Sequence, residues 1–248
     1  MKTLDTTPFL AATLLAVLAL AQATPGDAAG ILAQVDAAVN APRDQSINMK
    51  LILIDKSGAE KVRELTMLQK GSDKRIGKFL SPADQKGIGF LSLPAGVMYI
   101  YLPAFKKTRR IASHVKNNKF AGTDFTYEDM EAKNYADFWD PGLLRTEDGK
   151  YVLELKPKDG TETDYSKIIV WVGIDNYFPS KFEYYDKRGK LTKTMTRDKV
   201  EKVNGYLTAR ESEMRDLLSN HTTRMVITDV QFDIDIPNER FTERYLAQ

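Results

Sequence analysis

Hydrophobic and polar residues alternate with a period of two along most of the chain. Apolar side chains occupy every second position between residues 47 and 53, and the same alternation returns at 151–156 and 224–236. Because successive side chains of a strand point to opposite faces, this period predicts half-buried strands. Turn signals such as Asp55–Gly58 and Asn204–Gly205 separate the runs. The pattern therefore predicts a long antiparallel meander.

The expected strands are short and closely spaced. They lie at residues 47–53, 60–69, 75–80, 87–93, 97–102, 151–156, 167–173, 182–184, 191–203, 205–207 and 224–236. Residues 209–218 lie among strands but are good helix formers, so their conformation stays open at this point. A long sheet with few helices leaves an apolar face and two edges uncovered unless it curls. The fold class expected is mainly β (α+β), a curved antiparallel sheet that forms an unclosed β-barrel covered by a few short helices.

Helical spacing occurs near both ends of the expected sheet. Asp27 is a candidate N-cap, and Ile31, Leu32 and Val35 recur at helical spacing before Pro42. We therefore expect one amphipathic helix over residues 28–40. The final residues 239–246 predict a short helical turn.

A third helical signal surrounds Thr126–Asp129, which has the form of a capping box with Asp in place of Glu or Gln. We expect a short helical segment there, which Pro141 ends at the latest. This segment contains Tyr135, Phe138 and Trp139. Such large aromatic side chains either pack on the sheet or form a lid over a binding cavity.

The N-terminus has the organisation of a secretory signal peptide. Lys2 precedes the apolar run Phe9–Ala21, and Ala21-Gln22-Ala23 forms an A-x-A cleavage site. The alternative is a retained membrane anchor, but the run is shorter than the about 20 apolar residues that span a bilayer. We expect residues 1–23 to be removed, which leaves residues 24–248 as a single domain.

Composition narrows the function classes. The chain has no cysteine, which excludes disulfides, thiolate metal sites and a lipid-modified N-terminal cysteine. The net charge of +2 argues against nucleic acid as the main partner. No cofactor is expected, because the two histidines have no metal-ligand spacing and no nucleotide-binding motif is present.

Catalysis is not expected. Asp124, Glu128 and Asp129 form the one carboxylate cluster with acid–base capacity. Charge at a helix N-terminus and helix capping account for Glu128 and Asp129 without chemistry. The sequence therefore favours a protein that is not an enzyme.

A basic run follows the strand at residues 97–102. It contains six cationic side chains within a short reach: Lys106, Lys107, Arg109, Arg110, Lys116 and Lys119. The run is either a solvated hairpin edge, where cations discourage strand pairing, or a dock for an acidic partner or anionic lipid head groups. In an intermediate case Arg109 or Arg110 grips a ligand's phosphate or carbonyl at a cavity mouth.

The same region carries a resemblance to a known family. Its motif combines Leu102-Pro103-Ala104, Lys106-Lys107-x-Arg109-Arg110-Ile111 and Phe120-x-Gly122-x-Asp124-Phe125-x-Tyr127-Glu128-Asp129. Together with Tyr177-Phe178-Pro179, Thr222–Met225, Ile236-Pro237, Phe241-Thr242 and Arg244-Tyr245-Leu246, it resembles the outer-membrane lipoprotein-sorting (LolA-like) proteins. The resemblance covers most of the mature chain. It implies an unclosed β-barrel with a helical lid and a periplasmic location, and it favours a strand at 209–218.

The candidate ligand-binding residues follow from alternation. The inward sets are Met49, Leu51, Leu53, Tyr151, Leu153, Phe182, Tyr184 and Phe232, and the second choices are Phe79, Phe90, Tyr99, Tyr101, Phe125 and Trp139. These residues either line an empty cavity or pack against one another as an ordinary core. The candidate docking residues for a partner or a head group are Lys106, Lys107, Arg109 and Arg110.

These observations predict a periplasmic carrier. We expect it to bind the apolar, acyl part of a lipoprotein or lipid in a hydrophobic cavity and to pass it to or from a membrane complex. The expected partners are lipid or lipoprotein acyl chains and an inner-membrane transporter or exporter, with peripheral membrane contact, no nucleic acid and a monomeric state. The alternative is a non-catalytic accessory subunit of an exporter that binds no lipid.

Overall fold

The computed structural model describes residues 27–248, so the expected signal peptide at residues 1–23 lies outside the described residues. Within them, thirteen antiparallel strands form one sheet with the order β6-β5-β4-β3-β2-β1-β13-β12-β11-β10-β9-β8-β7. The strands are β1 (Asp44–Ile54), β2 (Glu60–Lys70), β3 (Lys74–Ser81), β4 (Gly89–Leu93), β5 (Val97–Leu102), β6 (Lys107–Ile111), β7 (Trp139–Glu147), β8 (Lys150–Pro157), β9 (Tyr165–Gly173), β10 (Pro179–Asp186), β11 (Leu191–Val203), β12 (Tyr206–Asp216) and β13 (His221–Phe232).

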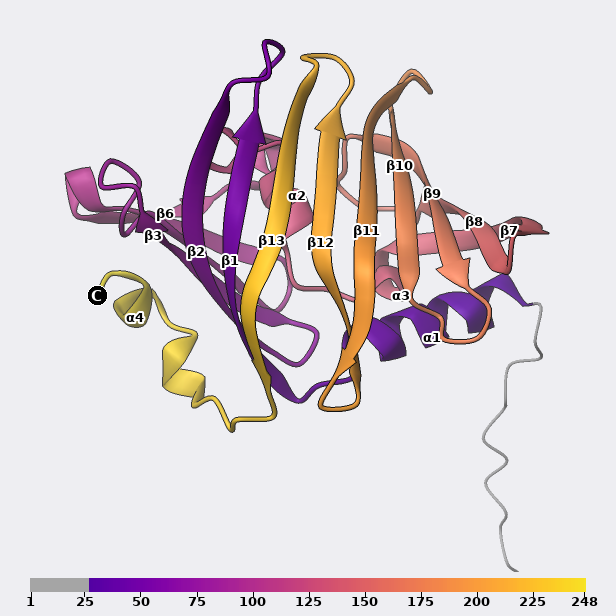
Figure 1. Cartoon of the computed structure of the whole chain (residues 1–248), viewed down its shortest axis with the longest axis horizontal. Coiled ribbons are helices and arrows are strands. Elements are labelled where there is room, and N and C mark those ends of the chain that lie inside the picture. Colours follow the sequence, from indigo (N-terminus) through magenta and orange to yellow (C-terminus); the bar gives the residue numbers. More distant parts are fainter. Residues whose placement is uncertain (1–26) are drawn as a thin grey trace, which may run out of the picture.

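The sheet is a meander whose first and last strands meet at its centre (Figure 1). β1 pairs antiparallel with β13, and Leu51 lies opposite Met225. From β1 the strands run outward in chain order to β6, and from β7 they run back to β13. β6 and β7 are therefore the two free edges. The sheet is curved but not closed, which confirms the expected unclosed barrel.

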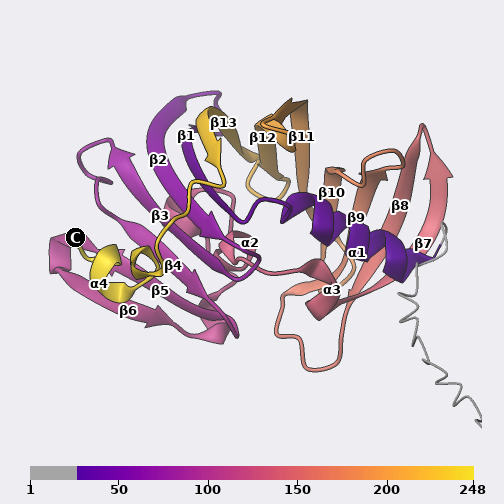
Figure 2. The same cartoon turned by 90° about the horizontal axis from the view of Figure 1, so that it is seen from below.

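The link between the two edges passes inside the curved sheet (Figure 2). Residues 112–138, here called the crossover segment, connect β6 to β7. Its short helices are η2 (Ser113–Val115), η3 (Phe120–Gly122), α2 (Tyr127–Met130) and α3 (Tyr135–Phe138). The sheet thus curves around a segment of its own chain, and this segment supplies one wall of the interior.

The curved sheet is here called the arch. Helix α1 (Ala28–Val39) lies at one end of the arch and contacts α3 and β7 (Figure 2). The side chain of Asp27 accepts a hydrogen bond from the backbone N–H of Ala29, which confirms the expected N-cap. Ile31, Leu32 and Val35 are buried. No helix in residues 27–248 is long and apolar enough to cross a membrane.

The helical segment expected after Thr126 ends before Pro141, as the sequence predicted, because α3 ends at Phe138. Trp139 was expected within this segment but is the first residue of β7. This part of the expectation was wrong because Pro141 was interpreted only as a helix terminator. Proline is also tolerated in an edge strand, where no second neighbour needs its N–H, and β7 pairs only with β8.

The last expected strand also ends early. β13 stops at Phe232, whereas alternation suggested a strand up to residue 236. The buried carboxylate of Asp44 accepts hydrogen bonds from the backbone N–H groups of Ile234 and Ile236 at 2.9 and 3.1 Å. These bonds replace the ladder and turn the chain out of the sheet. The open segment 209–218 is a strand for most of its length, within β12.

The C-terminal residues cover the outer face of the sheet. η4 (Asn238–Arg240) and α4 (Glu243–Leu246) follow β13, and α4 contacts β4 (Figure 1). Phe241 and Leu246 are buried with Ile76 and Leu91 in a second, smaller core. This outer cluster is separate from the main core inside the arch.

Candidate functional site

The inner face of the sheet carries the main core. Eleven of the fourteen predicted ligand-binding residues are buried in it: Met49, Leu51, Leu53, Phe79, Phe90, Phe125, Trp139, Leu153, Phe182, Tyr184 and Phe232. Tyr151 is partly buried and packs against the same cluster. The residues that alternation placed inward and four of the second choices (Phe79, Phe90, Phe125 and Trp139) therefore share one interior.

Tyr99 and Tyr101 lie elsewhere. Both pack against the outer cluster beneath the C-terminal residues, not against the main core. In β5 the buried residue Met98 belongs to the main core, so the odd-numbered positions point to the other face. We therefore leave the two tyrosines out of the candidate lining.

A cavity of about 270 Å³ lies among the inner face of the sheet, the crossover segment and the C-terminal end of α1. Of the predicted residues, Trp139, Tyr184 and Phe232 line it, and the others, apart from Tyr99 and Tyr101, belong to the surrounding core or pack against it. Further apolar lining comes from Ala38, Val39, Pro42, Ile47, Met67, Ile168, Phe178, Leu207, Ala209, Ile227 and Val230. The interior is thus packed around a smaller space than the whole aromatic set suggested.

The cavity wall also carries charge, which sequence reasoning missed. Arg75 projects from β3, and its guanidinium donates to Gln69 Oε1 at 2.7 Å and to the backbone oxygen of Met130 at 3.1 Å. Burial lowers the pKa of Arg75 to about 10, so it remains protonated at neutral pH. These bonds tie β3 to the crossover segment.

The crossover segment contributes three carboxylates to the wall: Glu128, Asp129 and Glu131. Each lies beside a lysine. The shortest N–O distances are 3.8 Å from Glu128 to Lys133, 3.2 Å from Asp129 to Lys193 and 2.9 Å from Glu131 to Lys116. Burial raises the pKa of Glu128. The network positions the segment inside the arch and leaves no carboxylate of the three without a cation.

The capping box at the start of α2 is confirmed. Thr126 Oγ1 accepts from the backbone N–H of Asp129, and Asp129 Oδ2 accepts from that of Thr126 at 2.8 Å. Asp129 also binds the hydroxyl of Tyr165 at 3.2 Å. Its oxygens are therefore engaged in fixing the segment.

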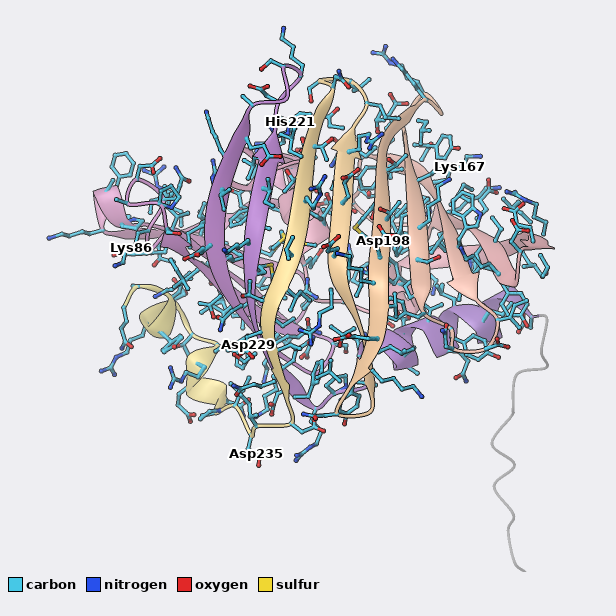
Figure 3. The ribbon with its side chains drawn as sticks, in the orientation of Figure 1. Lys86, Lys167, Asp198, His221, Asp229 and Asp235 are labelled. Atoms are coloured by element: carbon cyan, nitrogen blue, oxygen red, sulfur yellow. The ribbon has the colours of Figure 1, made fainter. Side chains whose placement is uncertain are left out.

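Asp124 fixes the crossover segment to the start of β13. Its buried carboxylate lies 2.6 Å from His221 Nδ1, accepts from Thr223 Oγ1 at 2.8 Å and pairs with Lys119 at 3.0 Å. His221 begins β13, at the upper end of the sheet in Figure 3.

Asp124 and Glu128 have separate partners, so the structure does not combine them in one acid–base site. No group of His, Asp and Glu side chains in residues 27–248 is arranged to hold a metal ion.

Four residues of the basic run lie in the edge strand β6 and the turn before it, whereas Lys116 and Lys119 lie in the crossover segment and pair with Glu131 and Asp124. Lys106, Lys107, Arg109 and Arg110 are exposed, and none makes an ion pair within residues 27–248. None of the four lines the cavity, so the structure does not support a ligand grip by Arg109 or Arg110. Phe105 beside them is 65% exposed. The run is accessible as a surface feature, away from the cavity lining.

Comparisons with known proteins agree with this architecture. A family model described as an uncharacterized protein matches residues 71–248, well over half of the chain. The comparison with curated proteins found no match.

Three solved structures resemble the chain closely, and each is matched over 88% of this chain. A DUF1329 family protein from Desulfovibrio piger has a TM-score of 0.83 and 25% identity, with 97% of its chain covered. A candidate outer membrane lipoprotein-sorting protein domain from Vibrio parahaemolyticus has a TM-score of 0.77 and 28% identity, also with 97% covered. A LolA superfamily protein from Nitrosomonas europaea has a TM-score of 0.75 and 24% identity, with 98% covered. The chain therefore belongs to the family that the matching model describes, and its fold is that of the LolA-like proteins.

Proposed function

We propose that this protein is a periplasmic carrier that binds the apolar part of a lipid or lipoprotein in the cavity inside the arch. The observation that carries the proposal is the cavity itself, which lies between the sheet, the crossover segment and α1. Its wall is built largely from aliphatic and aromatic side chains. The likeness to a lipoprotein-sorting protein domain supports the same function.

The energetics suit reversible transport. Each buried CH₂ group of an acyl chain contributes about 0.8 kcal/mol, and binding costs offset part of that sum. The cavity of about 270 Å³ lies near the lower end of the about 300–1,000 Å³ typical of small-molecule sites. A larger cargo therefore requires the crossover segment or α1 to move, and closing again would favour release.

The binding test uses a matched pair of alanines on α1. Ala38 lines the cavity, whereas Ala37 is exposed and does not line it. Protein is purified gently from the periplasm, its organic extract is analysed by mass spectrometry, and binding of a fluorescent fatty-acid analogue is titrated. The wild type and Ala37→Trp should carry lipid and bind the analogue, while Ala38→Trp should lose both. Absence of lipid and of analogue binding in the wild type would contradict the carrier function.

Transfer to a membrane complex is the second part of the proposal. The exposed cations of β6 and the neighbouring Phe105 form a surface that suits an acidic partner or an anionic membrane. We expect an inner-membrane transporter or exporter to dock there. An accessory subunit that binds no lipid would use the same surface, and the lipid extraction separates the two functions.

Docking is tested by charge reversal. Lys107→Glu, Arg109→Glu and Arg110→Glu together should abolish recovery of a membrane complex in a crosslinking pull-down. The control reverses Lys187, Arg188 and Lys190, three exposed cations near the β10–β11 turn. Equal recovery with both triple variants would show that β6 is not the docking surface.

A further inference from the structure

Arg197 is a cation inside the arch without a carboxylate partner. It projects from β11 and lines the cavity, and its Cζ atom lies 5.1 Å from the ring centroid of Phe182 and 5.6 Å from that of Phe178. Its side chain makes no hydrogen bond or ion pair with any residue in 27–248. The guanidinium thus makes cation–π contacts with two rings, and its N–H groups remain available to another acceptor.

The other charges in the wall do not neutralise it. Glu128, Asp129 and Glu131 each lie beside a lysine, at the distances given above. Arg75 uses neutral oxygens of Gln69 and of the crossover backbone. Arg75 and Arg197 are therefore two cations without a carboxylate partner in a partly enclosed space, where an anion could pair with them.

Two phenols extend the donor set beside Arg197. The ring of Tyr135 lies 6.0 Å from that of Phe182, which lies 6.1 Å from that of Tyr184. Both tyrosines line the cavity, and neither hydroxyl makes a hydrogen bond within residues 27–248. Burial raises the pKa of each phenol, so both retain a proton to donate at neutral pH.

Other unpaired polar atoms belong to the same wall. Among the described residues, the buried side-chain polar atoms without a partner are Trp139 Nε1 and Thr208 Oγ1. Both residues line the cavity. Buried donors are normally hydrogen-bonded, and a wholly hydrocarbon ligand would leave all of these groups unpaired.

We propose that the cavity binds an anionic amphiphile, whose carboxylate or phosphate accepts hydrogen bonds from Arg197 with Tyr135 and Tyr184 while its apolar chain lies against the aliphatic wall. This inference rests on the carrier function proposed above and specifies its cargo. The polar end of the cargo is thereby held inside the arch. The small volume selects one chain over several.

The test compares ligands that share a chain and differ in the head. Dodecanoate, dodecyl phosphate and dodecan-1-ol are titrated into a Trp171→Phe background, in which Trp139 is the remaining tryptophan and reports on the cavity. Both anions should bind about tenfold or more tightly than the alcohol, because a charge-assisted hydrogen bond is lost with the alcohol. The ratio between the two anions distinguishes a carboxylate from a phosphate head.

Variants then assign the preference to Arg197. Arg197→Gln should remove the preference for anions by weakening the binding of both anions far more than that of dodecan-1-ol, and Tyr184→Phe should reduce the preference. Arg197→Lys keeps the positive charge and should retain part of the preference for anions. A preference that persists in the lysine variant and is lost in the glutamine variant would be due to the charge and not to a loss of fold. The control is Arg215→Gln, an exposed arginine that pairs with Glu213.

The possible failures are distinct. Equal affinity for the three ligands, or an equal loss for all three in Arg197→Gln, would overturn the anionic cargo and leave the carrier function standing. No binding of any ligand to the parent protein would overturn both proposals. If Arg197→Gln bound both anions with undiminished affinity, the role of Arg197 would be overturned.

Discussion

Asp36 in α1 and Tyr135 in α3 are 99 positions apart in the sequence and are joined by a hydrogen bond of 2.7 Å, donated by the backbone N–H of Tyr135. The other carboxylate oxygen of Asp36 accepts from the N–H of Ala136 at 2.8 Å. The N-cap of α3, Asn134, makes no capping bond with its own side chain. A residue of α1 thus satisfies the first turn of α3, and the two helices beside the cavity are fastened together.

Asp36→Ala should loosen this connection. The substitution leaves two N–H groups of α3 without their charged acceptor, so we expect a loss of about 2 kcal/mol in the free energy of unfolding. Urea denaturation measures the loss, and amide hydrogen exchange at Tyr135 and Ala136 should accelerate. Asp137→Ala, which removes a nearby exposed carboxylate, is the control. Unchanged exchange at both amides would show that Asp36 does not hold α3.

Trp139 tests the unpaired donor in the wall. The side chain is 1% exposed, and its Nε1 atom has no acceptor among the described residues. Trp139→Phe removes this donor and keeps an aromatic ring, so we expect stability in the unliganded protein to change by less than about 1 kcal/mol. Trp139→Ala removes the packing as well and should cost about 3–5 kcal/mol. A similar loss in both variants would mean that the N–H group is satisfied in solution.

Acid stability should depend on Asp216. Burial by itself would raise the pKa of this carboxyl, but hydrogen bonds from Lys119 and from the backbone of Ser219 and Leu218 lower it to about 2. Because the folded-state pKa is below the unfolded value of about 3.9, the carboxylate stabilises the fold above that value. This stabilisation, about 2 kcal/mol, is lost as the pH falls toward 2.

The measurement is the free energy of unfolding between pH 2 and pH 7. Asp216→Asn should lower stability at pH 7 and flatten the decline between about pH 4 and pH 2. Asp198→Asn removes an exposed carboxylate of β11, labelled in Figure 3, and should retain the wild-type profile. A profile for Asp216→Asn that parallels the wild type would rule out this contribution.

Leu246 tests whether the outer cluster contributes to ligand binding inside the arch. The side chain is fully buried, and Gly89 of β4 lacks a Cβ atom at the point where Leu246 packs. Leu246→Ala should cost about 2–5 kcal/mol by opening a cavity in the outer cluster. Ligand affinity should be retained at temperatures where the variant stays folded, because the residue is absent from the cavity wall. A specific loss of binding in the folded variant would connect the two faces.

Local patterns predicted much of the fold because their causes are local. The period of two identified the strands β1 to β5, β8 to β11 and β13 and the start of β12, and Asp27 and Thr126 marked real helix starts. The rest of β12 was left open by the residues and was favoured as a strand only by the family resemblance. Strand β7 escaped because Pro141 carries the same signal in a helix terminus and in an edge strand. The end of β13 was not predicted because the carboxylate of Asp44, far away in sequence, accepts hydrogen bonds from the N–H groups of Ile234 and Ile236.

The candidate site was less predictable than the fold. Alternation shows which side chains share a face, but it does not show which face becomes concave, and so Tyr99 and Tyr101 were grouped with the inner residues. The sequence pattern did not single out Arg75 or Arg197 as candidate site residues. A signal was present, because Arg197 lies two positions after the buried Met195 and therefore shares its face.

The sequence by itself determined most of the antiparallel strands, their turns, the α1 helix and the exposed basic segment, since each depends on residues a few positions apart. The tertiary structure alone decided that residues 112–138 cross the inside of the arch, how much of the interior remains open, and which charges face that space. The physical reason is that enclosure depends on contacts such as Asp36 with Tyr135 and Arg75 with Met130. Each of these contacts closes a loop of many residues, and local periodicity carries no record of them.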